Sequence, residues 1–272
     1  MVGAPGRKPV VVYSADPGES PRPHYGEDML AWGWACDDTN HTRSILAFAS
    51  DIPTVVGEGP RWGIFGIVFA DGVPQGAPII LWQFPIPTSD LVSRVAPHAF
   101  AFTPQGCHMA FAGTTESVPG SPIYGIWKLH TSNRLTETLR SGATFHPHSM
   151  DWDRHDDHNR LILAITNARS PDWRNLMIID LMADSETEIE LFATEQGYEG
   201  YSSEHSPQWG PATSDGCERI AFSRSWWDTN PETGVFQRGL YLLDLDLTGT
   251  KSCQYSSPVR IDADWPRALD WR

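Results

Sequence analysis

Short apolar runs alternate with glycine-, proline- and aspartate-containing turns through most of the chain. The clearest order is a short strand, a glycine turn, an apolar strand, a variable loop and a second apolar strand. Residues 100–129 and 208–245 show this order in full, and residues 150–181 and 30–82 carry weaker copies. Because the runs are short and no convincing amphipathic helix separates them, the pattern predicts an all-β protein built from repeated sheets.

The repeat returns about every 50 to 65 residues, with about four strands in each copy, which is typical of the blades of a β-propeller. Residues Arg267-Ala-Leu-Asp-Trp271 look like the innermost strand of a further blade, after which the sequence stops. A lone strand would expose a sheet edge, and the apolar segment Pro9-Val-Val-Val-Tyr13 can pair with it. We therefore predict a single propeller domain over residues 1–272. We expect about five blades, or six, with the ring closed by pairing the N- and C-terminal strands.

Two copies carry a motif that can be compared with a known repeat. One reads Phe102-Thr-Pro-Gln-Gly106 followed by Met109-Ala-Phe111, and the other has Trp209, Ser214-Asp-Gly216 and Ile220-Ala-Phe222. This motif resembles the repeat of TolB-like (WD40-like) propellers. The resemblance is clear in two blades, fair in a third and poor in the N-terminal third of the chain. It implies the fold and leaves the function open.

A histidine stands four residues before the aromatic residue of three repeats: His98-Ala-Phe-Ala-Phe102, His148-Ser-Met-Asp-Trp152 and His205-Ser-Pro-Gln-Trp209. In a propeller the first strand of each blade lines the central channel, so equivalent side chains converge near one mouth. Neutral imidazoles are ligands for Mn, Fe, Zn or Cu, and we predict a metal site formed by His98, His148 and His205. Two alternatives remain: a metal-free substrate-binding or acid–base role, and structural histidines that hydrogen-bond neighbouring blades.

Other residues near the same mouth are candidates for catalysis. Arg267 occupies the equivalent position in the last blade and can hold a carboxylate or an enolate. Glu204 precedes His205 and can act as a general base, or can be an exposed loop acid. Tyr201, in the loop before His205, can donate a proton.

Substrate-binding candidates lie further out. His146 is two residues before His148 and is a supporting or solvent-exposed histidine. Trp173, Trp226 and Trp227 follow the second strands of their repeats and can stack on a sugar ring or a flat ligand, with packing between blades as the alternative. The acidic and histidine-rich run 151–158 has no glycine bend for a calcium loop, and we predict a solvated turn there.

Within the TolB-like group, the three histidines are similar in kind to those of the oligogalacturonate lyases. Those propellers bind a divalent metal through histidines in the central cavity and eliminate across an acidic sugar. This chain is shorter, and its other motifs do not match. A polyanionic substrate also suits an acidic chain poorly. The resemblance therefore implies the metal site and does not extend to the substrate.

The formal charge of −14 argues against nucleic acid or an anionic membrane as the main partner. No apolar run is long enough to span a bilayer. We expect a small-molecule or sugar-like ligand, and the oligomeric state stays open. Residues 1–9 lack the apolar core of a signal peptide, so we expect a cytoplasmic protein if the chain is complete, or a secreted one if a signal was removed. The four cysteines show no C-x-x-C spacing, and we favour buried free thiols over one or two disulfides.

These observations favour a small enzyme with its active site in the central funnel. The expected reaction is that of a lyase or a cyclase, with the three histidines, an arginine and a metal acting as Lewis acid. The alternatives are a non-catalytic propeller scaffold that binds a protein or a glycan, and a metal-free pericyclase of secondary metabolism.

Overall fold

The structure is a computed structural model. It describes residues 30–36, 42–52, 61–83, 92–118, 121–142, 145–154, 159–167, 175–189, 192–193, 200–201, 203–211, 213, 216–227, 236–247, 253 and 257–262. For some strand residues, among them His98, Tyr201 and Trp227, only the backbone is described. Every regular element in these ranges is a β-strand. None of them contains a helix long and apolar enough to cross a membrane.

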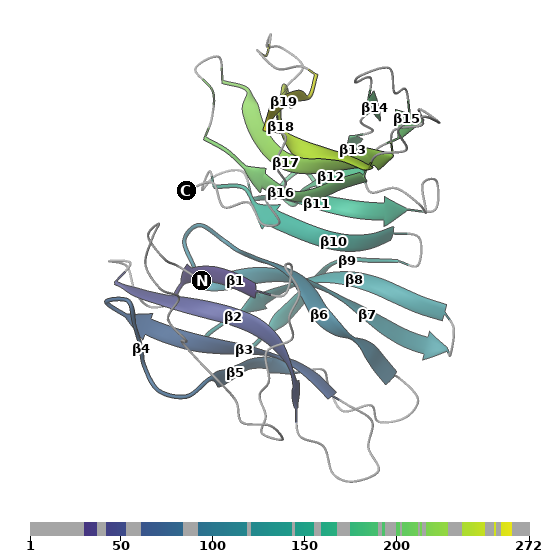
Figure 1. Ribbon diagram of the computed structural model, residues 1–272. Helices are drawn as coiled ribbons and strands as arrows, with labels where there is room; N and C mark the ends of the chain where they lie inside the picture. The colour runs from purple at the N-terminus through teal and green to yellow at the C-terminus, as the bar shows by residue number, and fades with distance from the viewer. Residues whose placement is uncertain are drawn as a thin grey trace.

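Four antiparallel sheets, which we call blades 1 to 4, follow one another along the chain (Figure 1). Blade 1 contains β1 (Leu30–Trp34), β2 (Arg43–Ile52), β3 (Arg61–Ala70), β4 (Val73–Pro74) and β5 (Ile79–Gln83). Blade 2 contains β6 (Val92–Phe102), β7 (His108–Val118), β8 (Ser121–His130) and β9 (Thr136–Gly142). Blade 3 contains β10 (Phe145–Trp152), β11 (Arg160–Asn167), β12 (Asn175–Asp180) and β13 (Ser185–Ile189). Blade 4 contains β16 (Ser203–Trp209), β17 (Glu218–Trp227), β18 (Phe236–Leu245) and β19 (Val259–Asp262).

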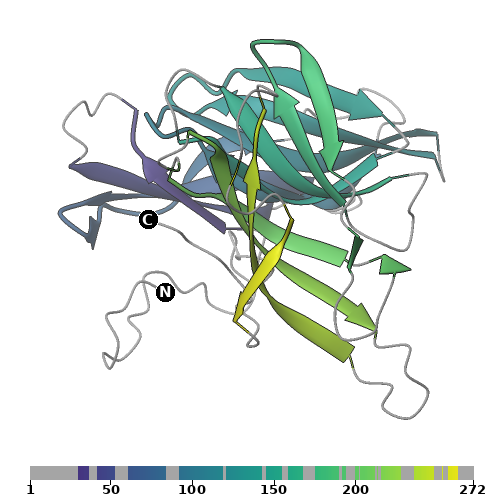
Figure 2. The same ribbon diagram turned by 90° about the horizontal axis from the view of Figure 1, so that it is seen from above.

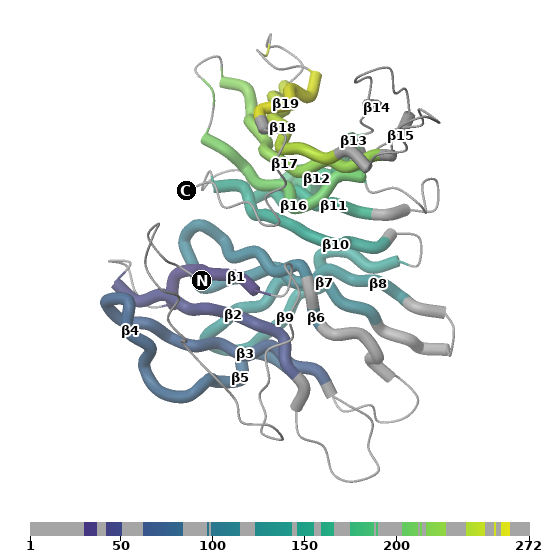
Figure 3. The backbone as a smooth tube through the Cα atoms, in the orientation of Figure 1, coloured from purple at the N-terminus to yellow at the C-terminus, as the bar shows by residue number. Residues whose placement is uncertain are grey.

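Within each blade the strands pair in chain order, except that β4 and β5 both pair with β3. A short hairpin of β14 (Phe192–Ala193) and β15 (Gly200–Tyr201) lies between blades 3 and 4 in the sequence. The first strands of the blades adjoin one another, because β6 contacts β1 and β10, and β10 contacts β16. The view from above and the backbone tube show the same succession of blades (Figures 2 and 3).

Successive antiparallel blades whose first strands adjoin form a β-propeller, as the repeat predicted. In the described ranges no strand pairing joins blade 1 to blade 4. The two strands predicted to close the ring, 9–13 and 267–271, lie outside the described residues. The blade number and the extent of the single domain therefore stay predictions.

The core lies between the blades, and the two-residue period of the strands decides which interface each side chain joins. In β7, Met109 and Phe111 join the cluster shared with blade 1, whereas Ala110 and Ala112 join the cluster shared with blade 3. The alanines face larger side chains of blade 3, among them Met150. In β11, Leu161, Leu163 and Ile165 face blade 2, while Ile162 and Ala164 face blade 4.

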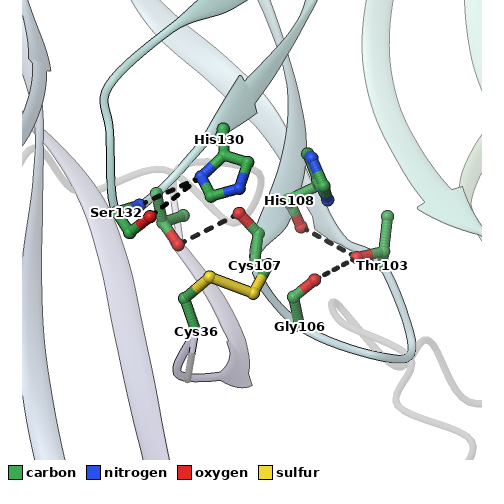
Figure 4. Close-up of a disulfide and its surroundings, with 8 residues drawn as sticks. Cys36, Thr103, Gly106, Cys107, His108, His130 and Ser132 are labelled. Atoms are coloured by element: carbon green, nitrogen blue, oxygen red, sulfur yellow. Dashed lines mark hydrogen bonds between the residues drawn. A yellow bond between two sulfur atoms is a disulfide. The ribbon is translucent and has the colours of Figure 1, made fainter. Parts of the chain in front are cut away.

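All four cysteines form disulfides, so the preference for free thiols was wrong. Cys36, just after β1, is bonded to Cys107 in the β6–β7 turn and joins blade 1 to blade 2 (Figure 4). Cys217 is bonded to Cys253 within blade 4. The repeat places a Gly-Cys pair in the same turn of blades 2 and 4. Gly106 has φ 75°, and a Cβ there would lie 2.6 Å from the Trp34 carbonyl oxygen, so only glycine permits this close approach.

Candidate functional site

The first strands of blades 2, 3 and 4 are all irregular at their predicted histidine. In β6 the pairing register shifts between His98, which pairs with Ala112, and Ala101. In β16 the register shifts between His205 and Gln208. In β10 the shift lies between Pro147 and Ser149, so His148 itself is the extra residue.

Two of these bulges carry a backbone conformation that is unusual for their side chains. Ala99, directly after His98, has φ 53°, and Ser206, directly after His205, has φ 46°. A bulge redirects the side chains of its strand, and such strained positions concentrate at binding and active sites. The three strands are therefore each distorted at or directly after their histidine, and β6 and β16 share the same form of distortion.

Blades 3 and 4 are joined next to two of the histidines. The backbone N–H of Ser206 donates to Ser149 Oγ at 3.0 Å. Further along, the N–H of Trp209 donates to Asp151 Oδ2 at 2.8 Å. Because Ser149 and Ser206 directly follow His148 and His205, the structure brings the backbones of these two histidines to the same interface.

His148 belongs to a small aromatic stack at the interface of blades 2 and 3. The rings of His146 and Tyr124 are stacked, with centroids 4.4 Å apart. The His146 and His148 rings are 4.3 Å apart and tilted by 41°. His146, predicted to support the site, is thus in contact with the predicted ligand His148. Tyr124 was not among the predicted residues, and it comes from β8, which the repeat alone does not connect with the channel.

His205 is fixed by two serines of β17. Its Nε2 lies 3.2 Å from Ser225 Oγ, and Ser223 Oγ donates to the His205 carbonyl oxygen at 3.1 Å. Both serines are buried. These contacts fix the orientation of the His205 ring against β17.

Glu204 is fully buried rather than exposed in a loop. Its side chain is 0% exposed, and Arg224 Nε donates to Glu204 Oε1 at 3.1 Å. The Arg224 guanidinium also lies over the rings of Phe222 and Tyr241, at 5.5 and 5.0 Å from their centroids. The pair is therefore enclosed between aromatic side chains and β16, and the predicted general-base role of Glu204 stays a prediction.

The predicted aromatic platform is described only at Trp226. This side chain is 1% exposed and packs edge-on against Tyr241 in the core between blades 3 and 4, which agrees with the packing alternative. Arg267 and Trp173 lie outside the described residues. For Tyr201 and Trp227 the structure gives strand positions, in β15 and β17, without side chains.

The described side chains contain no group of three histidines, cysteines or acids that could hold a metal ion. The side chain of His98 is not among them, so the structure leaves the three-histidine site untested. It places each of the three residues at or directly before a register shift of its own strand, and it places the His148 and His205 side chains in separate stacked or hydrogen-bonded surroundings.

The prediction of a solvated turn over residues 151–158 was wrong for its first part. Asp153 is 1% exposed, and Arg160 donates to its Oδ2 through Nε and Nη2 at 2.9 and 2.6 Å. Arg160 Nη2 also lies 2.9 Å from Glu218 Oε1 of blade 4. Asp153 was interpreted as solvent-exposed because Arg160, the cation with which it pairs, lies after the run 151–158 in the sequence. Residues 155–158 are outside the described part of the chain.

No family model matches the chain, and no curated protein matches it. Among solved structures, it is similar to the β-propeller domain of the Trilobed protease from Pyrococcus furiosus, with 11% identity and a TM-score of 0.45 over 84% of this chain and 57% of that one. An oligogalacturonate lyase in complex with manganese matches with 10% identity and a TM-score of 0.38, over 76% of this chain and 64% of that one.

An N-acetylgalactosamine deacetylase from F. plautii, in complex with blood group B trisaccharide, matches with 11% identity and a TM-score of 0.41 over 75% of this chain and 69% of that one. The chain spans less than two thirds of the length of the first two of these proteins. Because all three TM-scores are below 0.5, the propeller assignment rests on the sheet order and the adjoining first strands.

Proposed function

We propose that this chain is a TolB-like propeller enzyme that acts on a small polar or sugar-like molecule at the histidine bulges of blades 2, 3 and 4. The observation that supports this best is the recurrence of the bulge. Three successive first strands have a register shift at or directly after a histidine: His148 is itself the extra residue, and the shift follows His98 and His205. In β10 and β16 the other pairs are regular, whereas β6 has two further register shifts before His98.

The proposed metal ligands are His98, His148 and His205, and the donor set fits Mn, Fe, Zn or Cu. The hydrogen bond between His205 Nε2 and Ser225 is of the kind that commonly orients a metal-binding histidine. When bound, the metal would act as a Lewis acid toward a carbonyl or carboxylate oxygen of the substrate. Arg267 would hold the developing negative charge, and Tyr201 would donate a proton, in an elimination or a cyclisation.

Elemental analysis of tag-free protein tests the metal. We expect about one equivalent of a transition metal in the wild type and its loss in His148→Ala, as for a site with three protein ligands. His130→Ala is the matched control, because His130 bonds Ser132 in the β8–β9 turn, and it should retain the metal. Wild-type protein that takes up no metal after incubation with Mn, Fe, Zn and Cu would overturn this part of the proposal.

A metal-free pocket is the second candidate, and the contacts of the histidines favour it. The ring of His146 is stacked on Tyr124, and His205 Nε2 is bonded to Ser225, so these imidazoles already have partners that fix them as hydrogen-bonding groups. This candidate predicts a wild-type protein without metal. It also predicts that His205→Gln, which keeps a hydrogen-bonding side chain, binds small ligands as the wild type does.

A further inference from the structure

A cavity of about 270 Å³ lies between the β6–β7 turn and the residues Trp152, Asp153 and Asn159 of blade 3. Among its lining residues are Gln105, His108, Lys128, Trp152 and Asn159. Trp152 is four residues beyond His148, which corresponds to about 13 Å along a strand. The cavity is therefore separate from the histidine bulges.

The wall formed by the β6–β7 turn is held by a hydrogen bond within the turn and by contacts to two other parts of the fold. Within the turn, Thr103 Oγ1 donates to the Gly106 carbonyl oxygen at 2.7 Å. From the β8–β9 turn, Thr131 donates its N–H and its Oγ1 to the Cys107 carbonyl oxygen, at 2.8 and 3.1 Å. The disulfide to Cys36 attaches the same turn to blade 1 (Figure 4). A wall fixed in this way loses little conformational entropy when a ligand binds.

The cavity is lined by one ammonium group, that of Lys128. Lys128 Nζ lies over the Trp152 ring at 5.5 Å, and no carboxylate of the described residues forms an ion pair with it. Asp153, which also lines the cavity, is paired with Arg160, and the same guanidinium also pairs with Glu218. Burial, followed by the electrostatic effects of Lys128 and His130, lowers the pKa of His108, against an opposing effect of Glu137.

We propose that this cavity binds a small organic monocarboxylate, with Lys128 as the charge partner and His108, Gln105 and Asn159 as hydrogen-bonding groups. The single positive charge of the Lys128 ammonium balances the single negative charge of a carboxylate. A phosphate dianion needs more positive charge than these residues supply. Pro104 and Trp152 provide the apolar surface for the body of the ligand.

Calorimetric titration of the oxidised protein with acetate, pyruvate and benzoate tests the proposal. Benzamide is the matched probe, because it has the shape of benzoate without its charge. We expect at least one carboxylate to bind, Lys128→Met to weaken its binding at least tenfold, and Lys128→Arg to restore binding to within about threefold. Such a loss is typical of removing a charged hydrogen-bond partner. Arg238→Met removes an exposed positive charge in blade 4 and should leave binding unchanged.

Three results would overturn the proposal: no carboxylate binds, Lys128→Met binds like the wild type, or inorganic phosphate binds more tightly than every carboxylate. Circular dichroism melting of each variant establishes that it is folded. His148→Ala should bind the carboxylate as the wild type does, so failure at the histidine bulges and failure at this cavity are distinguished.

Discussion

The backbone N–H of Ser206 donates to Ser149 Oγ at 3.0 Å, across 57 residues of sequence. Each serine directly follows one of the predicted metal-binding histidines. The bulge in β16 directs this N–H away from its own sheet, and a side chain of the neighbouring blade accepts it. The distortions of blades 3 and 4 are thus coupled by one hydrogen bond.

Ser149→Ala should destabilise the protein by about 1–3 kcal/mol, because it leaves the N–H of Ser206 without its acceptor at a largely buried interface. Urea denaturation measures this change in the free energy of unfolding. Ser141→Ala, at an exposed position of β9, is the control and should change stability little. Equal stability of the two variants would show that this bond does not hold the blades together.

Arg160→Met should cost about 3–5 kcal/mol, because the substitution leaves the buried carboxylate of Asp153 without its cation. Arg140→Met breaks the ion pair with Glu186, which is partly exposed to solvent, and should cost less than about 1 kcal/mol. Both variants replace an ion-paired arginine by methionine, and they differ in how deeply the ion pair is buried. The difference between their denaturation midpoints therefore reports the effect of burial. A smaller loss for Arg160→Met than for Arg140→Met would contradict the arrangement described here.

Removing either disulfide as a paired Cys→Ser variant should lower stability by about 4 kcal/mol in the chain-entropy model. The loop closed by Cys36 and Cys107 spans 71 residues and that closed by Cys217 and Cys253 spans 36, so the first removal should cost slightly more. Thermal melting with and without dithiothreitol checks both values. The Cys36→Ser/Cys107→Ser variant should also lose carboxylate binding at the cavity, whereas the Cys217→Ser/Cys253→Ser variant should keep it.

The lowered pKa of His108 should make the stability of the protein depend on pH. Its pKa in the folded protein is lowered from the ordinary value of 6.5, mainly by burial and then by Lys128 and His130, against an opposing effect of Glu137. Below pH 6.5 the unfolded chain therefore takes up a proton before the folded protein does, and stability falls as the pH drops through the folded pKa. Above 6.5 the contribution is fully present.

His108→Gln should remove this dependence, since glutamine does not titrate. Urea denaturation of both proteins on either side of this window is the measurement. We expect the wild type to lose more stability than the variant as the medium becomes acidic. Parallel losses in the two proteins would mean that His108 has an unshifted pKa.

The sheets were predictable because successive side chains of a strand face opposite sides, which gives the sequence a two-residue period. Met109-Ala-Phe111 alternates large and small side chains. In the structure Met109 and Phe111 pack toward blade 1, and Ala110 packs toward blade 3. The bulges were not predicted, although the chain contains a signal for them. Pro97, Pro147 and Pro207 flank the three histidines, and proline inside a strand marks a bulge or an edge.

The remaining contacts depend on residues that are distant in the sequence. Nothing near Arg160 reveals that Glu218 of blade 4 pairs with it, and nothing near His146 reveals its contact with Tyr124. The disulfide partners are likewise separated by a whole blade in one case. Such pairs follow from how the blades adjoin, which a pattern of apolar and polar positions does not specify.

The Cys36–Cys107 bond has a consequence for proteolysis. The loop that it closes contains β2, β3, β4, β5 and β6, so a single cut of the backbone anywhere between these cysteines leaves one covalent molecule. The two fragments would migrate together on a non-reducing gel and separate only after reduction. Blade 1 therefore stays attached to blade 2 even when the chain that connects them is broken.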